Sequence, residues 1–115
     1  MFEIKVITDK ISRDELRELA KPMYGELVKG VVDIDQRIIA VGGELHADEE
    51  RVLLDAGSQQ ENLWGVNLYP DVEGDAWLEF DSMINIRPSQ GNRSRGIENP
   101  DVQKTIHEIV HERTE

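Results

Sequence analysis

The chain has 115 residues and a formal net charge of -11, from 24 acidic residues against 13 lysines and arginines. It contains no cysteine, which excludes disulfides, zinc–thiolate sites and cysteine nucleophiles. Duplex nucleic acid is bound mainly through clustered lysine and arginine, so an acidic chain of this kind is not expected to bind it. No apolar run approaches the roughly 20 residues of a membrane span, and we expect a cytoplasmic protein that does not enter the membrane.

Hydrophobic periodicity predicts eight elements along the chain. Strands are expected over residues 2–6, 27–35, 38–46, 62–69 and 77–88, and helices after Ser12, over 48–56 and after Asn99. The order β-α-β-β-α-β-β-α predicts an α+β fold in one domain spanning residues 1–115. In this fold a single layer of about five mostly antiparallel or mixed strands is covered by three helices.

The ends of the predicted helices carry recognisable signals. Ser12 followed by Glu15 is typical of a capping box at the start of the first helix. Asn99 and Pro100 suit the N-cap and first positions of the last helix, and Gly57 suits the position after the second. The inner face of the helix over 48–56 is expected to be apolar: Val52, Leu53 and Ala56.

The joint between the third strand and the second helix, residues 42–48, is the first candidate site. Glu44 and His46 are two residues apart on the predicted strand and would share a face. A carboxylate beside an imidazole can act as an acid–base pair or ligate a divalent metal, and Asp48 could join them. Glu44, His46 and Asp48 are therefore candidate catalytic residues, with His46 and Glu44 as candidate metal ligands. The structural alternative is that His46 caps the helix, with Glu49 at its third position, while the negative charge of Asp48 stabilises the helix through its dipole.

The polar loop over residues 87–95 is the second candidate site. Three of the 13 lysines and arginines fall within these nine positions, separated by glycine, serine and asparagine. Guanidinium groups and loop N–H groups suit a small anion such as a carboxylate or phosphate. The candidate ligand-binding residues here are Arg87, Asn92 and Arg93. The alternative is that these arginines pair with the protein's own acids, such as Asp81 or Glu44.

Two asparagines inside predicted strands, Asn67 and Asn85, are further candidates for ligand binding. Each needs hydrogen-bond partners if it is buried, and each could line the floor of a pocket or form a cross-strand pair. The aromatic residues Trp64, Tyr69 and Trp77 indicate either core or a subunit interface, so a homo-oligomer is compatible with the sequence.

Three runs, GGELHAD, GSQQENLWGVNLYP and FDSMINIRPSQGNRSRGIENP, resemble a family of small prokaryotic proteins catalogued as a domain of unknown function. The resemblance covers nearly the whole chain. It implies a single-domain prokaryotic protein and carries over no catalytic residue.

Two functional hypotheses follow from these residues. The first is a domain that binds a small anionic ligand or a metal, with hydrolysis as a candidate reaction and Asp81 as a supporting acid. It requires the 42–48 joint and the 87–95 loop to lie within about 10 Å in a single pocket. The second is a non-enzymatic interaction or oligomerisation module, in which Trp64, Tyr69 and Trp77 would form a contact patch.

Overall fold

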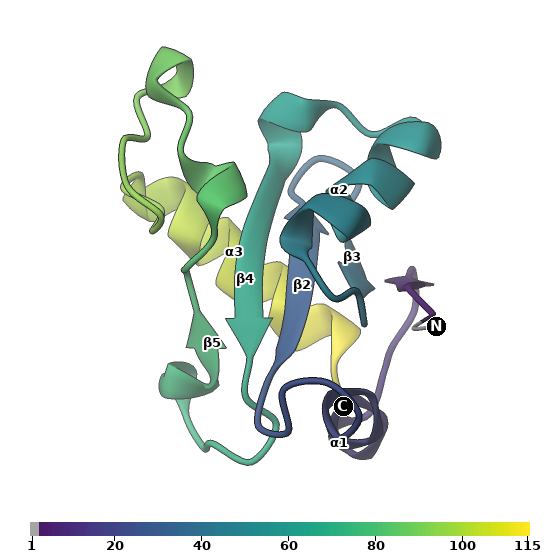
Figure 1. Cartoon of the computed structure of the whole chain (residues 1–115). Helices are drawn as coiled ribbons and strands as arrows, with labels where there is room; N and C mark the ends of the chain where they lie inside the picture. Colours follow the sequence, from purple (N-terminus) through teal and green to yellow (C-terminus); the bar gives the residue numbers. More distant parts are fainter. Residues whose placement is uncertain (1–2) are drawn as a thin grey trace.

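The computed structural model describes residues 3–115 and shows a five-stranded sheet with helices on both faces (Figure 1). The elements are β1 (Lys5–Ile7), α1 (Arg13–Ala20), β2 (Val28–Asp33), β3 (Ile38–Val41), α2 (His46–Asp55), β4 (Leu63–Leu68), β5 (Leu78–Glu79) and α3 (Pro100–Arg113). Short 3-10 turns lie in the connections at Gln60–Asn62, Asp75–Trp77, Met83–Asn85 and Pro88–Gln90. This order and the α+β class confirm the prediction, although Phe2, the expected start of the first strand, lies outside the described residues.

All strand pairs are antiparallel, in the order β1-β3-β2-β4-β5. β2 and β3 form the predicted hairpin, and Asp33 fixes its turn because one carboxylate oxygen accepts from the N–H groups of Asp35 and Gln36 at 2.9 and 3.0 Å. β2 and β4 pair along their full lengths at the centre of the sheet. Their register places Lys29 opposite Asn67, which becomes important for the site.

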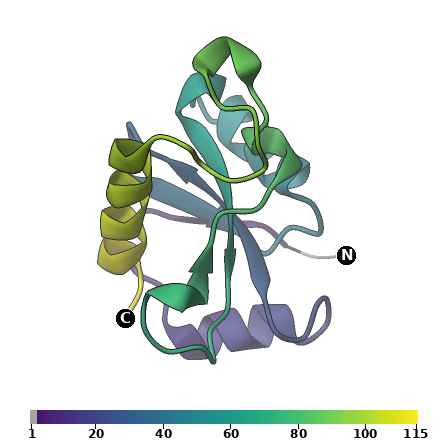
Figure 2. The same cartoon turned by 90° about the vertical axis from the view of Figure 1, so that its left-hand side faces the viewer.

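The two faces of the sheet are covered differently (Figures 1 and 2). α1 and α3 supply side chains to one large apolar cluster with alternate residues of β2, β3 and β4. α2 lies over the opposite face, where the fully buried apolar cluster contains only Val31, Ala40, Leu53 and Leu63. Polar side chains such as His46 and Asn67 are also buried on this side. We call these the α1/α3 face and the α2 face.

The helix-end signals at Ser12, Asn99 and Gly57 lie at helix ends as predicted, although only the Ser12 half of the capping box forms among the described residues. The Ser12 hydroxyl accepts a hydrogen bond from the Glu15 N–H at 3.1 Å, and the Asn99 side chain accepts one from the Asp101 N–H at 2.8 Å. These side chains satisfy N–H groups that have no partner within the helix. Gly57 follows α2 with a φ of +107°, a backbone conformation that favours glycine.

The third strand ends before Gly42, and the prediction that it continues to His46 is wrong. Gly42 has a φ of +93°, and a Cβ there would lie 2.9 Å from the carbonyl oxygen of Glu3, so the chain turns out of the sheet at a position suited to glycine. α2 begins at His46 itself, with no side chain capping it. Glu44 and His46 therefore do not share a strand face.

The predicted strand over residues 77–88 is also wrong beyond Glu79, where β5 ends. The Asn85 amide donates to the Gly65 carbonyl at 3.0 Å and accepts from the Gly65 N–H at 2.8 Å. Farther along the same edge, the Arg87 guanidinium donates to the carbonyl of Leu63. These side chains occupy the hydrogen-bonding groups of β4 that a longer β5 would have used, so the backbone of this segment is free to turn.

Candidate functional site

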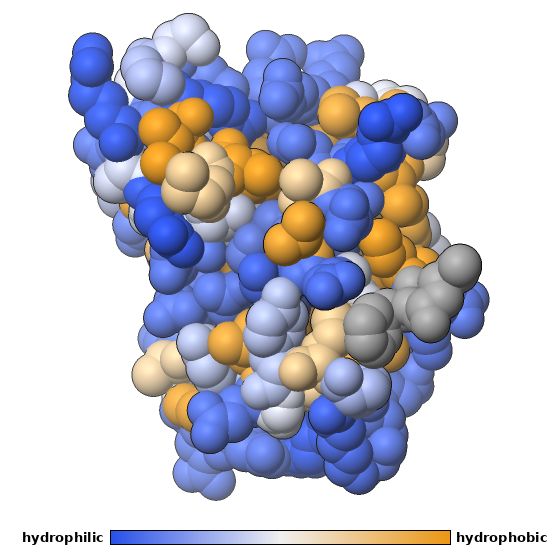
Figure 3. All heavy atoms as spheres, viewed as in Figure 1, coloured by the Kyte–Doolittle hydropathy of each residue, from blue (hydrophilic) through white to orange (hydrophobic). Residues whose placement is uncertain are grey.

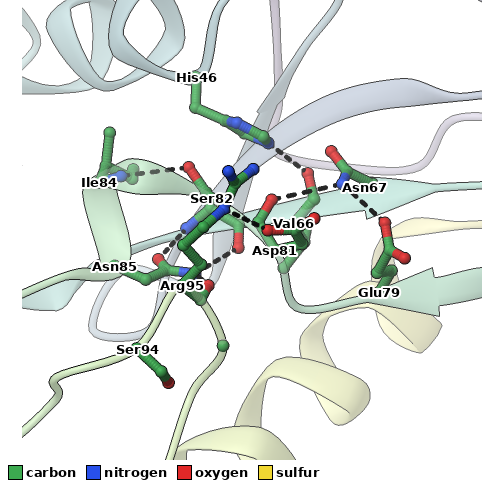
Figure 4. A network of polar contacts seen from close by, with 12 residues as sticks. His46, Val66, Asn67, Glu79, Asp81, Ser82, Ile84, Asn85, Ser94 and Arg95 are labelled. Carbon is green, nitrogen blue, oxygen red and sulfur yellow. Dashed lines mark hydrogen bonds and ion pairs between the residues drawn. The ribbon is translucent and has the colours of Figure 1, made fainter.

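A pocket of about 360 Å³ opens on the α2 face, between the start of α2, strands β2 and β4, and the segment after β5. Its polar lining consists of Lys29, His46, Asn67, Asp81, Ser82 and Arg95. Figure 4 shows five of these side chains converging from α2, β4 and the segment after β5. The apolar rim includes Tyr24, Leu45 and Met83, all exposed, and apolar atoms are visible at the surface of this face in Figure 3. A mixed lining of this kind is typical of small-molecule sites.

His46, the first residue of α2, points inward and is 8% exposed. Its Nε2 lies 2.8 Å from the Val66 carbonyl oxygen, which can only accept, so Nε2 carries the hydrogen of the neutral ring. Burial lowers the pKa of the imidazole, and Lys29 lowers it further, while the Val66 carbonyl opposes this effect. His46 is therefore a neutral, oriented imidazole at neutral pH, and it is not the helix cap considered above.

Lys29 lies in the middle of β2 and is half-buried. Its ammonium nitrogen sits 4.9 Å from the centre of the Tyr24 ring, a cation–π contact. No carboxylate of residues 3–115 lies within 4.0 Å of this nitrogen, although the chain is strongly acidic. The pocket thus contains an ammonium group that forms no ion pair among the described residues, although its charge lowers the pKa of the buried Glu49 carboxyl, against the larger effect of burial.

The opposite wall of the pocket is held by Asp81 and Arg95, whose side chains form an ion pair at 2.6 Å. This pair bears out the alternative that an arginine of the 87–95 loop bonds an acid of the protein. Next to it, the Asn67 amide donates to the Glu79 side chain at 2.9 Å and to the Asp81 carbonyl at 3.3 Å. The Asn67 Oδ1 is buried and has no hydrogen bond among the described residues. The Asn67 side chain lies beside His46 and raises the pKa of its imidazole, against the larger effect of burial. Asn67 therefore lines the pocket and also pairs across the strands with Glu79, so both alternatives considered for it from the sequence apply.

Glu49 is a buried carboxyl group directly behind this pocket, on the inner face of α2. It is fully buried, and one oxygen accepts from the Gly43 N–H at 3.2 Å, while the other has no hydrogen-bond partner among the described residues. Burial raises its pKa well above 4.5, so the group favours its protonated form. The predicted inner face of Val52, Leu53 and Ala56 is wrong in part, because Ala56 is exposed and the buried residues are His46, Glu49 and Leu53.

The other members of the predicted catalytic group lie outside the pocket lining. The Glu44 and Asp48 side chains are exposed, and Glu44 contributes only its backbone carbonyl, which accepts from the Tyr24 hydroxyl. No three histidine, aspartate or glutamate side chains within residues 3–115 are grouped so as to hold a metal ion. The geometry thus gives no support to Glu44 and His46 as joint metal ligands.

The 42–48 joint and the 87–95 loop do meet at this pocket, but only through Arg95. Arg87 is directed elsewhere, because its guanidinium stacks on Trp64 at 4.1 Å and donates to backbone carbonyls. Arg93 is exposed and does not line the pocket.

The two remaining predicted ligand-binding residues, Asn85 and Asn92, are buried within the protein's own hydrogen bonds. The Asn92 amide donates to the carbonyls of Asn85 and Gly96 at 2.7 and 2.8 Å, and its oxygen accepts from the Glu98 N–H at 2.8 Å. Asn85 holds the edge of β4, as described above. Both side chains shape the segment that forms the pocket wall, and neither offers a free donor to a ligand.

The predicted aromatic contact patch is not found at the surface. Trp64 and Trp77 belong to the large apolar cluster of the α1/α3 face, and Tyr69 is half-buried with its hydroxyl bonded to Glu79 at 3.0 Å. An interaction surface would have to use other residues.

A second pocket, of about 460 Å³, lies on the α1/α3 side between α3 and the β5 region. Its arginine, Arg13, stacks over Trp77 at 4.0 Å and donates to the carbonyls of Pro70 and Val72. The guanidinium group of Arg13 is therefore already bound by an aromatic ring and by backbone carbonyls. Although this pocket is larger, it lacks the free cation and the buried, oriented imidazole of the pocket on the α2 face, and we regard the latter as the candidate site.

A family model described as "Protein of unknown function (DUF5674)" matches residues 5–113. The chain belongs to this family. Neither the curated proteins nor the solved structures include a match to the chain. Within residues 3–115, no helix has the length and apolar character needed to cross a membrane.

Several side chains at or behind this pocket were not among the candidates drawn from the sequence, and the most important of them are Lys29, Tyr24 and Glu49. For Lys29 a signal exists, because it is the one charged residue within the apolar run Val28 to Val32. For Glu49 the signal is its spacing of three from His46, which places both on one face of a helix that begins at 46. Tyr24 lies in a loop, and its sequence surroundings give no signal.

Proposed function

We propose that this protein binds a small molecule with a carboxylate group and an apolar body in the pocket on the α2 face. The observation that carries the proposal is Lys29, an ammonium group half-buried in a pocket and without an anionic partner among the described residues. In a chain with a net charge of -11, a cation in this position is best explained by an anion that comes from outside.

The rest of the pocket supports the same ligand class. The pocket lies at the start of α2, whose N-terminal end carries partial positive charge and no side-chain cap. Leu45, Met83 and Tyr24 offer apolar contact at the rim. Arg95 is neutralised by Asp81, which favours a ligand with one negative charge over one with several.

This proposal is one of binding, without a reaction. Glu44 and Asp48 are exposed and do not line the pocket with His46, and the imidazole nitrogen that carries hydrogen is bonded to a backbone carbonyl. The cysteine-free composition supports a reducing, cytoplasmic setting as part of the same proposal.

The experiment is calorimetric titration with acids of different apolar bodies, namely butanoate, 4-methylpentanoate and phenylacetate, each beside its uncharged amide. We expect at least one acid to bind and its amide to bind at least tenfold more weakly. Lys29→Met should lower the affinity for the acid by a similar factor. Lys104→Met, on the exposed side of α3, is the matched control and should bind as the unmodified protein does. Equal binding of acid and amide, or undiminished binding by Lys29→Met, would contradict the proposal.

A further inference from the structure

His46 and Lys29 line the same pocket, and the ammonium group of Lys29 disfavours a positive charge on the His46 ring. The imidazole is oriented by its Nε2 hydrogen bond to Val66 at 2.8 Å. Its other nitrogen, Nδ1, forms no hydrogen bond with the described residues. Unlike the fully buried polar atoms that have no partner, it remains accessible to solvent. A proton can therefore be added at Nδ1 without breaking the bond that holds the ring.

We infer that the pocket takes up a proton at His46 when it binds a carboxylate, so that His46 becomes the second cationic anchor of the ligand and binding tightens as the pH falls. This inference rests on the proposed function. It adds the protonation state in which the site works and assigns His46 a role in binding that does not require catalysis.

The electrostatic reason is the position of Lys29. A carboxylate that pairs with Lys29 cancels the repulsion between the ammonium group and a charged imidazole, and it adds a negative charge beside the ring. Both changes favour the imidazolium form. The proton comes from solvent and goes to Nδ1, while the ligand stays ionised, so no other group needs to change its charge.

Burial of His46 opposes the charged ring, but two neighbouring side chains favour it. The Asn67 side chain lies beside it and favours the positive form, and its buried Oδ1 has no donor in this structure. Asp81, from the segment after β5, acts in the same direction, although Arg95 partly neutralises it.

Other titratable groups near the ring come from α2 and from the loop before β2. On α2 itself, Glu49 is buried and favours its protonated form, and Asp48 is exposed. From the loop before β2, Tyr24 contributes a neutral ring and a hydroxyl bonded to the Glu44 carbonyl. Lys29 is thus the charge that opposes protonation of His46, and it is the charge that the ligand neutralises.

The test is calorimetric titration of the unmodified protein with the acid that binds best among the three probes, between pH 6 and 8. Titrations in buffers of different ionisation enthalpy give the number of protons taken up. We expect uptake approaching one proton at the upper end of this range and an affinity that rises by up to tenfold for each pH unit lowered. NMR of the labelled histidine ring should show His46 changing from the neutral to the imidazolium form on saturation at pH 7.

His46→Gln is the diagnostic variant, because a glutamine amide can still donate to the Val66 carbonyl but cannot take up a proton. We expect it to bind the acid more weakly and with no pH dependence over the same range. His111→Gln, on the exposed surface of α3, is the matched control and should keep the full pH dependence.

Two results would overturn the inference, and they can be told apart. If the acid binds through Lys29 but no proton is taken up and the His46 ring stays neutral, the proton-linked role is wrong and the carboxylate site stands. If no acid binds in a Lys29-dependent way, the proposed function itself is wrong. The NMR measurement is made on the unmodified protein, so the outcome does not depend on how well His46→Gln folds.

Discussion

The two faces of the sheet are covered by different kinds of side chain. The α1/α3 face carries a continuous apolar cluster that joins residues of both helices to β2, β3 and β4. The α2 face has a small apolar cluster and, beside it, a lysine that forms no ion pair within residues 3–115, an oriented imidazole and a buried carboxyl group. Burial of apolar surface stabilises a fold, whereas buried polar groups cost free energy unless they are fully bonded. We therefore assign stability mainly to the first face, and the proposed binding site lies on the second.

The largest expected effect is on the α1/α3 face. Ile106 of α3 is fully buried in the large cluster. We expect Ile106→Ala to lower the free energy of unfolding by about 2–5 kcal/mol, the range for truncating a buried aliphatic side chain. Urea unfolding followed by circular dichroism measures the change. Val102→Ala, half-buried at the edge of the same cluster, is the control and should cost less. Equal losses would show that the cluster is not the centre of stability.

The next effect tests the wall of the pocket. Asn85→Ala removes both hydrogen bonds to Gly65 and one to the Arg95 carbonyl, leaving buried backbone groups without partners. We expect a loss of about 2–4 kcal/mol, since an unsatisfied buried group costs about 1–3 kcal/mol. Gln90→Ala removes a single exposed hydrogen bond to Glu61 and should change the unfolding free energy by less than about 0.5 kcal/mol. If Asn85→Ala were as mild as Gln90→Ala, the wall would be held by other contacts.

A third prediction concerns the packing behind the pocket. A Cβ added to Gly43 would lie 2.8 Å from Glu49 Cγ, too close for two carbons. We expect Gly43→Ala to cost about 1–3 kcal/mol, as is usual for overpacking. In the background of Glu49→Ala the same change should cost much less, and a double-mutant cycle of unfolding free energies measures the coupling. Gly96→Ala, whose nearest atoms lie 3.6 Å from the added carbon, is the control. Simple additivity of the Gly43 and Glu49 changes would contradict the contact.

The smallest effect is a dependence on pH. Because burial raises the pKa of Glu49, the folded protein binds this proton more tightly than the unfolded chain does. The stability of the unmodified protein should therefore fall as the pH rises above about 4.5, and Glu49→Gln should remove that contribution. We expect Glu49→Gln to raise Tm at pH 7 by a few degrees, about 4 °C or more for each kcal/mol regained, and to leave it nearly unchanged at pH 4. A constant difference between pH 4 and 7 would mean that Glu49 does not titrate in this way.

The sequence predicts most of the fold because local signals and tertiary packing agree there. Alternating apolar residues mark the paired strands, and the caps at Ser12 and Asn99 lie where the helices begin. The prediction failed after Glu79, where residues alternate as in a strand but the side chains of Asn85 and Arg87 take the edge of β4. Such a competition between side chain and backbone cannot be recognised from periodicity alone.

The site was predicted less well, for a reason that can be traced to one boundary. With the helix placed from residue 48, His46 falls on a strand beside Glu44; with its true start at 46, the partner of His46 on the inner face is Glu49. Moving the helix start by two residues thus replaces the exposed Glu44 with the buried Glu49 as the acid on the same face as His46. Lys29 was missed because its importance lies in forming no ion pair with the part of the chain that the structure describes, and this is visible only in three dimensions.

The side chains that bind the edge of β4 also bear on how the protein behaves at high concentration. An open strand edge is a template on which another chain can add a strand, and it leads to aggregation. β5 covers only two residues of β4, and Asn85 and Arg87 occupy polar groups of Gly65 and Leu63 that would otherwise stay open. The same residues that end β5 therefore protect β4 from pairing with a neighbouring molecule.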